Sequence, residues 1–500
     1  MSTTDEPPGD DQRAVFENTV LDRLRTIFDA NPWIVTTEMI QGSANLATIV
    51  QALTDQPVLA VGAANGVGRP PENVKTLVLG MEPSDEPTVT MRRGQVLLAD
   101  PPAEFQATVD RWDPTGSARA IAGTTDVSGV RMGRPTFGAR REAWRALEDK
   151  LAIEAVWAAA GIPVAPSRQV SVADRDGLLV ACRELAGEGG TVVAGDNRSG
   201  WHGGGAGTFW APDEAAVHRL LDAPDALGRF DRVRVMPFLE GVPCSIHGMV
   251  VPDGGGDRAV VTFRPCEMLV LRDLATHGFV YSRSATYWDP PAVDRQQMKA
   301  TAEAIGRELT DQVDFRGVFT VDGVLTHDGF APTEVNPRYG AALPARHPTI
   351  DGQALSLFLL NLAVVEGLLD DLDLRPIGPI ATSELDRARR GVAFVHTEVV
   401  PQDERRAVVV GDGSGGLDVV ETTGDPDRHA ELARLDGDHP ALVVSVEFGS
   451  AAASSGLAAV EFLSAPVGPP LGPVLVEVAR ALDRAWGVGV GDLQAARSVR

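Results

Sequence analysis

The stretch "PTEVNPRYG", residues 332–340, is the part of the sequence from which the fold can be inferred. Glu334, Asn336 and Arg338 stand at every second position in it. Alternate side chains of an extended strand point the same way, so a carboxylate, an amide and a guanidinium would share one face. The wet face of an ordinary strand would also carry such residues, and these three alone leave that alternative open.

The residues before this stretch predict a β-hairpin. "GVFTVDGVLTHDGFAPTEVNPR" (317–338) contains two strand-like runs, and a turn centred within about a residue of Asp328 and Gly329 would place Asp322 opposite Glu334. A competing turn at Asp322 and Gly323 would leave Asp322 at a loop tip. In the first arrangement Asp322, Glu334 and Asn336 meet. Mg²⁺ prefers such oxygen ligands together with water and phosphate, so the hairpin predicts a metal ion and a nucleotide.

The composition excludes some classes of protein. Five hundred residues suggest about three or four domains, and an apolar content of 44% is typical of soluble globular chains. The formal net charge of −24 argues against a general nucleic-acid binder, which presents a basic surface. The most apolar stretch, 354–369, is too short to span a bilayer and reads as a buried helix. We therefore expect neither a nucleic-acid nor a membrane partner.

The cysteines and the N-terminus predict a cytoplasmic location. Cys182, Cys244 and Cys266 form no CxxC pattern and cannot all pair, which suits a reducing compartment. "MSTTDEPPGDDQR" lacks the basic and apolar regions of a signal peptide, and residues 1–11 read as a disordered tail. Oligomeric state stays open, with a homodimer the commonest assembly of soluble enzymes.

The pattern of apolar residues predicts an α/β (α+β) chain with three domains. The N-terminal domain, 12–130, reads as a Rossmann-like α/β layer with a helix at 12–30 and strands in "PVLAVGAANG", "KTLVLGMEP" and "GQVLLADPP". The middle domain, 131–372, begins with a helix over 141–160 and continues with a strand at 191–195, a glycine-rich loop at 196–207 and mostly strands over 232–287. A small α/β domain, 378–500, follows, and no chemistry can be assigned to it.

Four elements in a fixed order resemble the ATP-grasp fold of carboxylate–amine ligases. They are Lys150 followed by "GIPVAP", a strand with the loop "HGGGAG" (202–207), the strand pair "VMPFLEGVPCSIHG" (235–248), and the pattern D-x11-E-x-N-P-R that begins at Asp322. The resemblance covers roughly residues 130 to 370. A preceding α/β domain and an additional C-terminal domain are similar to the arrangement in the pheganomycin-type peptide ligases.

The resemblance implies roles for the matching residues. Asp322, Glu334 and Asn336 would hold Mg²⁺, two ions in all, and Arg338 would face the reacting phosphate or acyl group. The other matching residues would bind ATP. Lys150 would contact phosphate, and Gly203, Gly204 and Gly205 would form a lid over the triphosphate. The hinge segment Met236, Pro237, Phe238, Leu239 would contact adenine through backbone groups.

Other residues near these motifs are weaker candidates. Arg264 is a second candidate to stabilise negative charge at the acyl carbon, although a surface position at a strand end fits it equally. Ser245 and His247 alternate on one strand and would reach ribose or substrate, unless His247 is structural. Cys244 and Cys266 read as core residues, because neither has an evident base partner.

The sequence departs from the family pattern at two places. The family usually has a second lysine on the strand before the glycine loop, whereas "TVVAGDN" has none, and Arg198 is the nearest cation. The hinge usually opens with an acidic residue, and Met236 stands there. Both departures bear on ATP affinity.

The resemblance implies an ATP-dependent ligase that forms a C–N bond through an acyl phosphate and releases ADP and phosphate. Its substrates would be an amino acid-like acid and the amine of an amino acid or peptide. Two alternatives remain at this stage. One is an ATP-grasp phosphotransferase or carboxylase, and the other is a nucleotide-binding protein that has lost turnover.

Overall fold

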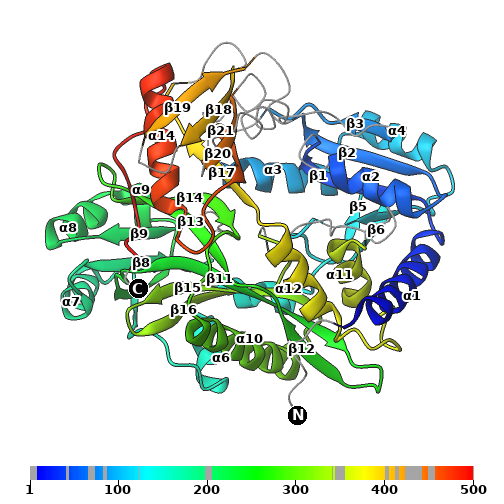
Figure 1. Cartoon of the computed structure of the whole chain (residues 1–500), viewed down its shortest axis with the longest axis horizontal. Helices are drawn as coiled ribbons and strands as arrows, with labels where there is room; N and C mark the ends of the chain where they lie inside the picture. Colours follow the sequence, from blue (N-terminus) through cyan, green and yellow to red (C-terminus); the bar gives the residue numbers. More distant parts are fainter. Residues whose placement is uncertain are drawn as a thin grey trace.

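The computed structural model describes residues 8–40, 44–65, 74–82, 87–121, 123–197, 205, 207–340, 342–343, 355–399, 405–411, 416–422, 442–448 and 457–498. The predicted tail therefore lies mostly outside the described residues, and helix α1 (Asp10–Phe28) already begins at Asp10. Two large sheets organise the chain (Figure 1). No helix in the described residues is long and apolar enough to cross a membrane.

The N-terminal sheet is the α/β layer predicted from the sequence. Its strand order is β3-β2-β1-β4-β6-β5, and every neighbouring pair except β5–β6 is parallel. Its elements after α1 are β1 (Trp33–Met39), α2 (Ala44–Leu53), β2 (Val58–Ala64), β3 (Lys75–Val78), α3 (Pro87–Ala99), α4 (Ala103–Trp112), β4 (Arg119–Ile121), β5 (Val130–Arg131) and β6 (Arg134–Phe137). Short parallel strands joined by helices are typical of doubly wound folds.

One predicted strand in this region is wrong. "GQVLLADPP" lies largely within helix α3, where Thr90, Gly94 and Leu98 are buried at a spacing of four residues. This spacing is that of a helix, and Pro87 is suited to a first helical position. Gly94 also lies against Glu38 of β1, because an added Cβ would come 3.1 Å from the Glu38 Cγ.

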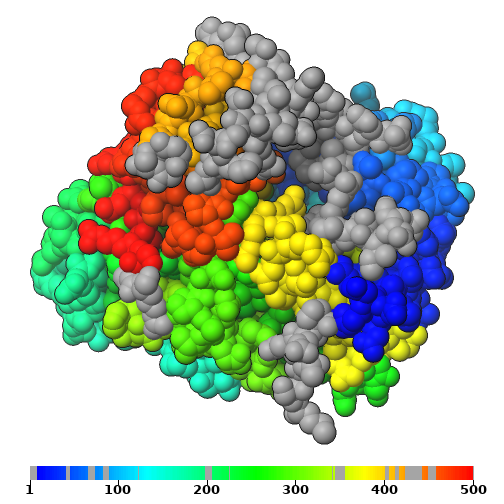
Figure 2. Space-filling view, in the orientation of Figure 1, coloured from blue at the N-terminus to red at the C-terminus, as the bar shows by residue number. Residues whose placement is uncertain are grey.

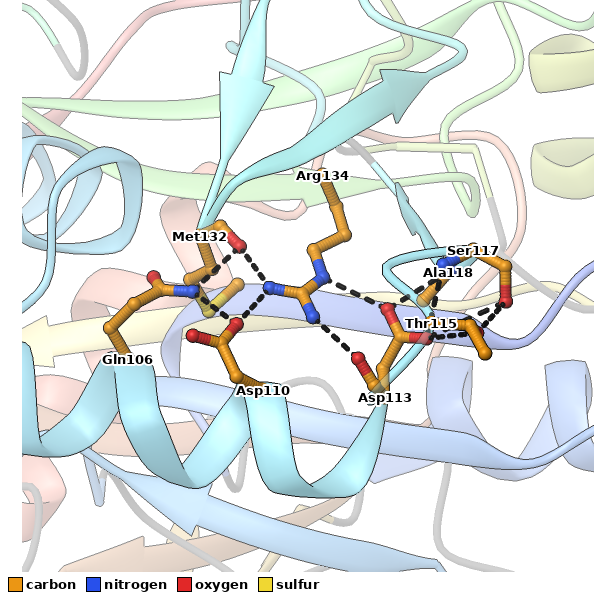
Figure 3. A network of polar contacts seen from close by, with 8 residues as sticks. All are labelled: Gln106, Asp110, Asp113, Thr115, Ser117, Ala118, Met132 and Arg134. Carbon is orange, nitrogen blue, oxygen red and sulfur yellow. Dashed lines mark hydrogen bonds and ion pairs between the residues drawn. The ribbon is translucent and has the colours of Figure 1, made fainter.

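Arg134 fixes the β5–β6 hairpin to the end of α4 (Figure 3). Its Nε donates to the Asp113 carboxylate at 2.9 Å and its Nη2 to the Asp113 carbonyl at 2.9 Å, while Nη1 reaches Asp110 and the Met132 carbonyl. Asp113 in turn accepts hydrogen bonds from the backbone N–H groups of Ser117 and Ala118. These bonds join the last hairpin of the N-terminal sheet to the end of α4.

The predicted helix at 141–160 is interrupted. It consists of α5 (Glu142–Arg145), a 3-10 turn (Ala146–Glu148) and α6 (Ile153–Ala159). The Asp149 carboxylate accepts hydrogen bonds from the backbone N–H groups of Leu151 and Ala152, at 2.8 and 3.3 Å, and such local bonds compete with a continuous helix. Lys150 consequently lies on a turn and not on a helix face.

A four-stranded unit follows, with strands in the order β7-β10-β8-β9. Its elements are β7 (Arg168–Ser171), α7 (Arg175–Leu185), β8 (Thr191–Gly195), β9 (Thr208–Ala211), α8 (Glu214–Asp222), the short α9 (Pro224–Leu227) and β10 (Arg232–Pro237). Residues of α7 and α8 cover one face of this β7–β10 unit, where Val193, Val233 and Val235 are buried. The opposite face carries the alternate residues.

The larger sheet continues through the rest of the chain in the order β16-β15-β11-β13-β14-β17-β21-β20-β18-β19. Its elements are β11 (Val242–Pro252), β12 (Arg258–Thr262), β13 (Cys266–Asp273), β14 (Gly278–Ala285), α10 (Ala292–Val313), β15 (Gly317–Thr326), β16 (Gly329–Asn336), α11 (Leu357–Val365), α12 (Ile377–Arg387), β17 (Gly391–His396), β18 (Arg405–Gly411), β19 (Leu417–Glu421), β20 (Leu442–Phe448), β21 (Leu457–Ser464), α14 (Gly472–Trp486) and β22 (Leu493–Ala495). Helix α12, which the sequence pattern did not predict, lies at the surface between the C-terminal strands and α1 (Figure 2).

The C-terminal strands join the middle strands in one sheet, because β14 pairs with β17 and β13 pairs with β22. The N-terminal sheet in turn extends to Phe137. Sheet continuity alone does not divide the chain, so the domain limits at 130, 372 and 378 stay predictions. The side of β11, β15 and β16 that carries Cys244, Val321 and Val335 packs against α6 and α10.

Candidate functional site

The predicted hairpin forms, and its register is confirmed. Asp322 of β15 lies opposite Glu334 of β16, and Thr320 lies opposite Asn336. The turn is His327 and Asp328, one residue earlier than predicted, and the competing turn at Asp322 is wrong. Val321 and Val335 are buried in the core beneath α10, so Asp322, Glu334 and Asn336 share the other face.

Hydrogen bonds orient the Asp322 carboxylate. Asn336 Nδ2 donates to its Oδ2 at 2.7 Å, and the Ser245 hydroxyl on neighbouring β11 donates to its Oδ1. Burial, followed by the negative charge of Glu334, raises the pKa of Asp322. The pair of carboxylates therefore repel each other in a buried setting, and a bound cation would relieve that repulsion.

The donor chemistry of this cluster fits Mg²⁺. It offers two carboxylates and an amide oxygen, and the Glu334 side chain keeps about a quarter of its surface exposed at 27%. The described residues contain no group of three or more Asp, Glu, His or Cys side chains that could hold a metal ion. Two carboxylates and one amide are fewer ligands than octahedral Mg²⁺ takes, so this cluster would supply only part of a ligand shell. Mg²⁺ prefers such a partial shell, because it retains water and phosphate oxygens.

Arg338 joins this cluster through its guanidinium. Its Nη2 donates to Asn336 Oδ1 at 3.1 Å, and its Nε donates to Glu148 Oε1 at 2.9 Å. Glu148, which is 4% exposed, also forms an ion pair with Arg140, with 2.7 Å between Arg140 Nη1 and Glu148 Oε1. The buried Glu148 carboxylate thus bridges two arginines, one directly after the β15–β16 hairpin, which is the proposed metal hairpin, and one after the last strand of the N-terminal sheet.

The end of the motif requires glycine. Gly340 packs against β11 so closely that an added Cβ would lie 2.2 Å from His247 Nε2. His247 is buried, and burial with the nearby Arg338 charge lowers its pKa to about 3. His247 is therefore a neutral packing residue, and this position favours the structural alternative over a contact with ribose.

Lys150 lies between the start of β9 and Glu334, and its phosphate contact stays a prediction. Its Nζ donates to the Thr208 hydroxyl at 2.7 Å and lies 4.0 Å from Glu334 Oε2. Thr208 begins β9, directly after the glycine-rich segment, and its backbone N–H binds the Gly205 carbonyl at 3.0 Å. The backbone N–H of Asn197, at the start of that segment, binds Asp149 at 3.1 Å. The Lys150 turn is therefore tied to both ends of the loop.

Gly205 has a φ of +84°, a conformation that favours glycine. The predicted lid residues Gly203 and Gly204, and Arg198 as the proposed replacement for the missing lysine, lie outside the described residues. Their roles stay predictions.

The predicted hinge is an aromatic corner. β10 ends at Pro237, and the Phe238 backbone N–H binds the Gly190 carbonyl at 3.0 Å. The Phe238 ring stacks on Phe279 with centroids 6.4 Å apart and an angle of 4°, and the Arg272 guanidinium lies 5.2 Å from its centroid. Met236 is buried, and Leu239 is half-buried. The corner is apolar enough for a purine, which stays a prediction.

Arg264 lies elsewhere. Its guanidinium pairs with Asp386 of α12 and donates to the carbonyls of Thr286 and Trp288, at 3.3 and 2.7 Å. These bonds tie the segment before β13 to α12. Among the described residues these contacts give Arg264 a structural role, and its catalytic role stays a prediction.

Three functional candidates were missed by sequence reasoning: Arg140, Glu148 and Arg234. Glu148 lies 190 residues from Arg338, and no local pattern reports that contact. The sequence does indicate that Arg234 is unusual, because it lies between the two valines of "RVRVM" in an otherwise apolar strand.

The β7–β10 unit, the larger sheet and the hairpin with its two acids and one amide define the class of the molecule. It has the mixed α/β ATP-grasp fold, with a Rossmann-like sheet before it. No protein-family model matches the sequence, and no curated protein matches it.

Solved structures share this fold. Biotin carboxylase from Campylobacter jejuni, in a β,γ-ATP complex, has a TM-score of 0.51 at 12% identity, with 94% of each chain covered. N5-carboxyaminoimidazole synthase from Aspergillus clavatus, in complex with ADP and 5-aminoimidazole ribonucleotide, has a TM-score of 0.49 at 14% identity, covering 91% of this chain and 99% of that one. At such identities the likeness concerns the fold alone.

Proposed function

We propose that this protein is an ATP-dependent ligase that joins a carboxylic acid to an amine through an acyl phosphate. One observation carries the proposal: the hairpin brings Asp322, Glu334 and Asn336 to one face, with Arg338 and Lys150 bound at its two sides. Two acids that face each other in a partly buried site and are flanked by two cations suit a metal-bound polyphosphate.

The substrates would react in two steps. A carboxylate oxygen of the acid attacks the γ-phosphorus of ATP, and the bond between that phosphorus and the bridging oxygen breaks to release ADP. The amine nitrogen then attacks the acyl carbon of the acyl phosphate. The carbon–oxygen bond to phosphate breaks, phosphate leaves, and the amine loses a proton to solvent as the amide forms.

The chain's own residues would mainly position and neutralise charge. Mg²⁺ bound by Asp322, Glu334 and Asn336 would supply charge neutralisation of the triphosphate. Arg338, held by Glu148, would face the transferring phosphoryl group, and Lys150 would bind a phosphate oxygen. Carboxylate and triphosphate repel one another, so bringing them together is the main catalytic task, and it needs little covalent help.

The proposal extends to the chemical class of the acid and of the amine that are joined. An amino acid-like acid and an amino acid or peptide amine follow from the similarity to pheganomycin-type peptide ligases. The tests are ADP formation and mass spectrometry of products from mixed amino acids and peptides with ATP and Mg²⁺. Asp322→Asn is the variant that tests the site, because it keeps the shape of the side chain and removes its charge. An Asp322→Asn variant that made product at the normal rate would remove Asp322 from the metal site.

Carboxylation is the second candidate. The fold match to biotin carboxylase spans 94% of this chain, which includes the N-terminal and C-terminal parts and not the middle region alone. Bicarbonate would then take the place of the acid. Phosphate release that requires bicarbonate and no other acid would favour this candidate, whereas release that requires an organic acid would favour the ligase.

A further inference from the structure

Arg234 is a buried cation on β10 for which the proposed mechanism gives no role. It is 5% exposed. Its neighbours Val233 and Val235 belong to the core beneath α7 and α8. Side chains alternate along a strand, so Arg234 and Met236 lie on the opposite face of the β7–β10 unit.

The guanidinium reaches across to the metal hairpin. Arg234 Nη2 donates to the Thr333 carbonyl at 2.9 Å, and Thr333 directly precedes Glu334. On β8, Ala194 lies directly opposite Arg234 in the ladder, and Val192 lies opposite Met236. The small side chain of Ala194 leaves room for the arginine, and the face of β8 that it belongs to supplies no cation of its own.

The charge of Arg234 is not paired. Among the described residues no carboxylate forms an ion pair with it, and its Nε has no hydrogen-bond partner. Glu154, Glu334 and Asp149 attract it from a distance, yet desolvation outweighs that attraction and lowers its pKa.

Two of these three acids, Glu154 and Asp149, lie outside the hairpin and already accept hydrogen bonds from other groups. Glu154 accepts a hydrogen bond from Gln169 Nε2 at 2.8 Å and one from the Ser167 hydroxyl, and Asp149 caps the Lys150 turn. A buried charge without a partner is destabilising, and a bound anion would supply the missing partner.

We propose that Arg234 binds the polyphosphate of the nucleotide, as the second phosphate-binding cation beside Lys150. The inference rests on the proposed function, since it needs a nucleotide at this hairpin. Both cations lie next to Glu334, Lys150 through its Nζ and Arg234 through the Thr333 carbonyl. A planar guanidinium matches phosphate oxygens through paired N–H groups, and the Arg234 Nε has no hydrogen-bond partner among the described residues.

A purely structural role is the alternative. In that case Arg234 would serve only to hold β10 against β16 through the Thr333 carbonyl, and its loss would weaken every ligand alike. The two roles differ in one measurable respect: a phosphate contact matters for ATP and ADP and not for adenosine.

The test is calorimetric titration of ATP, ADP and adenosine, with Mg²⁺ present, into the wild-type protein, Arg234→Met and Arg234→Lys. Arg258→Met is the matched control, because Arg258 pairs with Asp314 at the end of α10, on the far side of the sheet. We expect Arg234→Met to weaken ATP and ADP binding about 10- to 100-fold, the effect of losing a charge-assisted hydrogen bond. Adenosine binding should change less than about threefold, and Arg234→Lys should lie between.

Two results would overturn the inference alone. They are an Arg234→Met variant that binds ATP as tightly as the wild type, and one that weakens ATP and adenosine equally. A wild-type protein that binds no ATP would instead overturn the proposed function, and this inference with it. Should Arg234→Met fail to fold, Arg234→Lys carries the same comparison, since it keeps a cation and loses only the planar fork.

Discussion

Replacing Glu148 by glutamine tests the ion-pair bridge that Glu148 forms between Arg140 and Arg338. The substitution keeps the shape of the side chain and removes the negative charge that lies between Arg140 Nη1, at 2.7 Å, and Arg338 Nε, at 2.9 Å. Arg140 is 5% exposed and would be left as an uncompensated buried charge. Loss of one partner of a buried pair costs about 3–5 kcal/mol.

The expected shift in melting temperature follows from the size of the chain. An unfolding entropy of about 2 cal/mol/K per residue gives roughly 1 kcal/mol/K for 500 residues, so the melting temperature should fall by about 3–5 °C if the chain unfolds as one unit. If only the part around Glu148 unfolds first, the fall is larger. Scanning calorimetry measures it directly.

Glu142→Gln is the matched control. Glu142 pairs with Arg145 three residues away, and both side chains are exposed, at 64% and 41%. An exposed pair contributes about 0–1 kcal/mol, so the control should melt within about 1 °C of the wild type. A Glu148→Gln variant as stable as Glu142→Gln would refute the bridge. Adding Arg140→Met to Glu148→Gln should recover part of the loss, because it removes the stranded charge.

Three further predictions concern Asp322, Glu267 and Arg264. Since the pKa of Asp322 is raised, metal affinity should rise with pH between 5 and 8 as the carboxylate loses its proton, and a Mn²⁺ titration of Asp322→Asn should lack this rise. Burial raises the pKa of Glu267 from 4.5 to about 7, so the folded state binds the extra proton and stability should fall as pH rises through that interval, by on the order of 3 kcal/mol, whereas unfolding of Glu267→Gln should lack this slope. Arg264→Met should lower the melting temperature, because it breaks the bond to Asp386, and leave the affinity for ATP with Mg²⁺ within about threefold of the wild-type value in calorimetry. A larger loss of ATP affinity would indicate that Arg264 contributes to ATP binding.

The hairpin could be predicted from the sequence because its information is local. Alternating side chains and a short turn near Asp-Gly predict the two strands, but the turn alone pairs Gly323 with Pro332 and would leave Asp322 opposite Thr333. A register shift between Asp322 and Gly323 places Asp322 opposite Glu334. A helix around 293–312 is predicted from the sequence for the same reason, and α10 spans Ala292–Val313, with Met298, Ala302, Ile305 and Leu309 buried at three- and four-residue intervals.

Local sequence patterns did not predict the structure where a side-chain contact or a contact between distant residues determined it. The apolar run in α3 is short enough to read as a strand, and its contact with Glu38 of β1 is visible only after folding. The helix predicted at 141–160 is interrupted because the Asp149 side chain binds the backbone of the next turn. The Glu148 bridge depends on a contact across 190 residues, which no periodicity reports.

Electron paramagnetic resonance of Mn²⁺ tests the central claim most directly. Mn²⁺ in place of Mg²⁺, with a non-hydrolysable ATP analogue, reports free and bound metal at the hairpin. We expect the wild-type protein to bind Mn²⁺ more tightly when the analogue is present, and Asp322→Asn and Glu334→Gln each to lose most of that binding. If the analogue had no effect on Mn²⁺, or both variants bound it as the wild type does, the three side chains on the hairpin would not be a site for a metal-bound triphosphate.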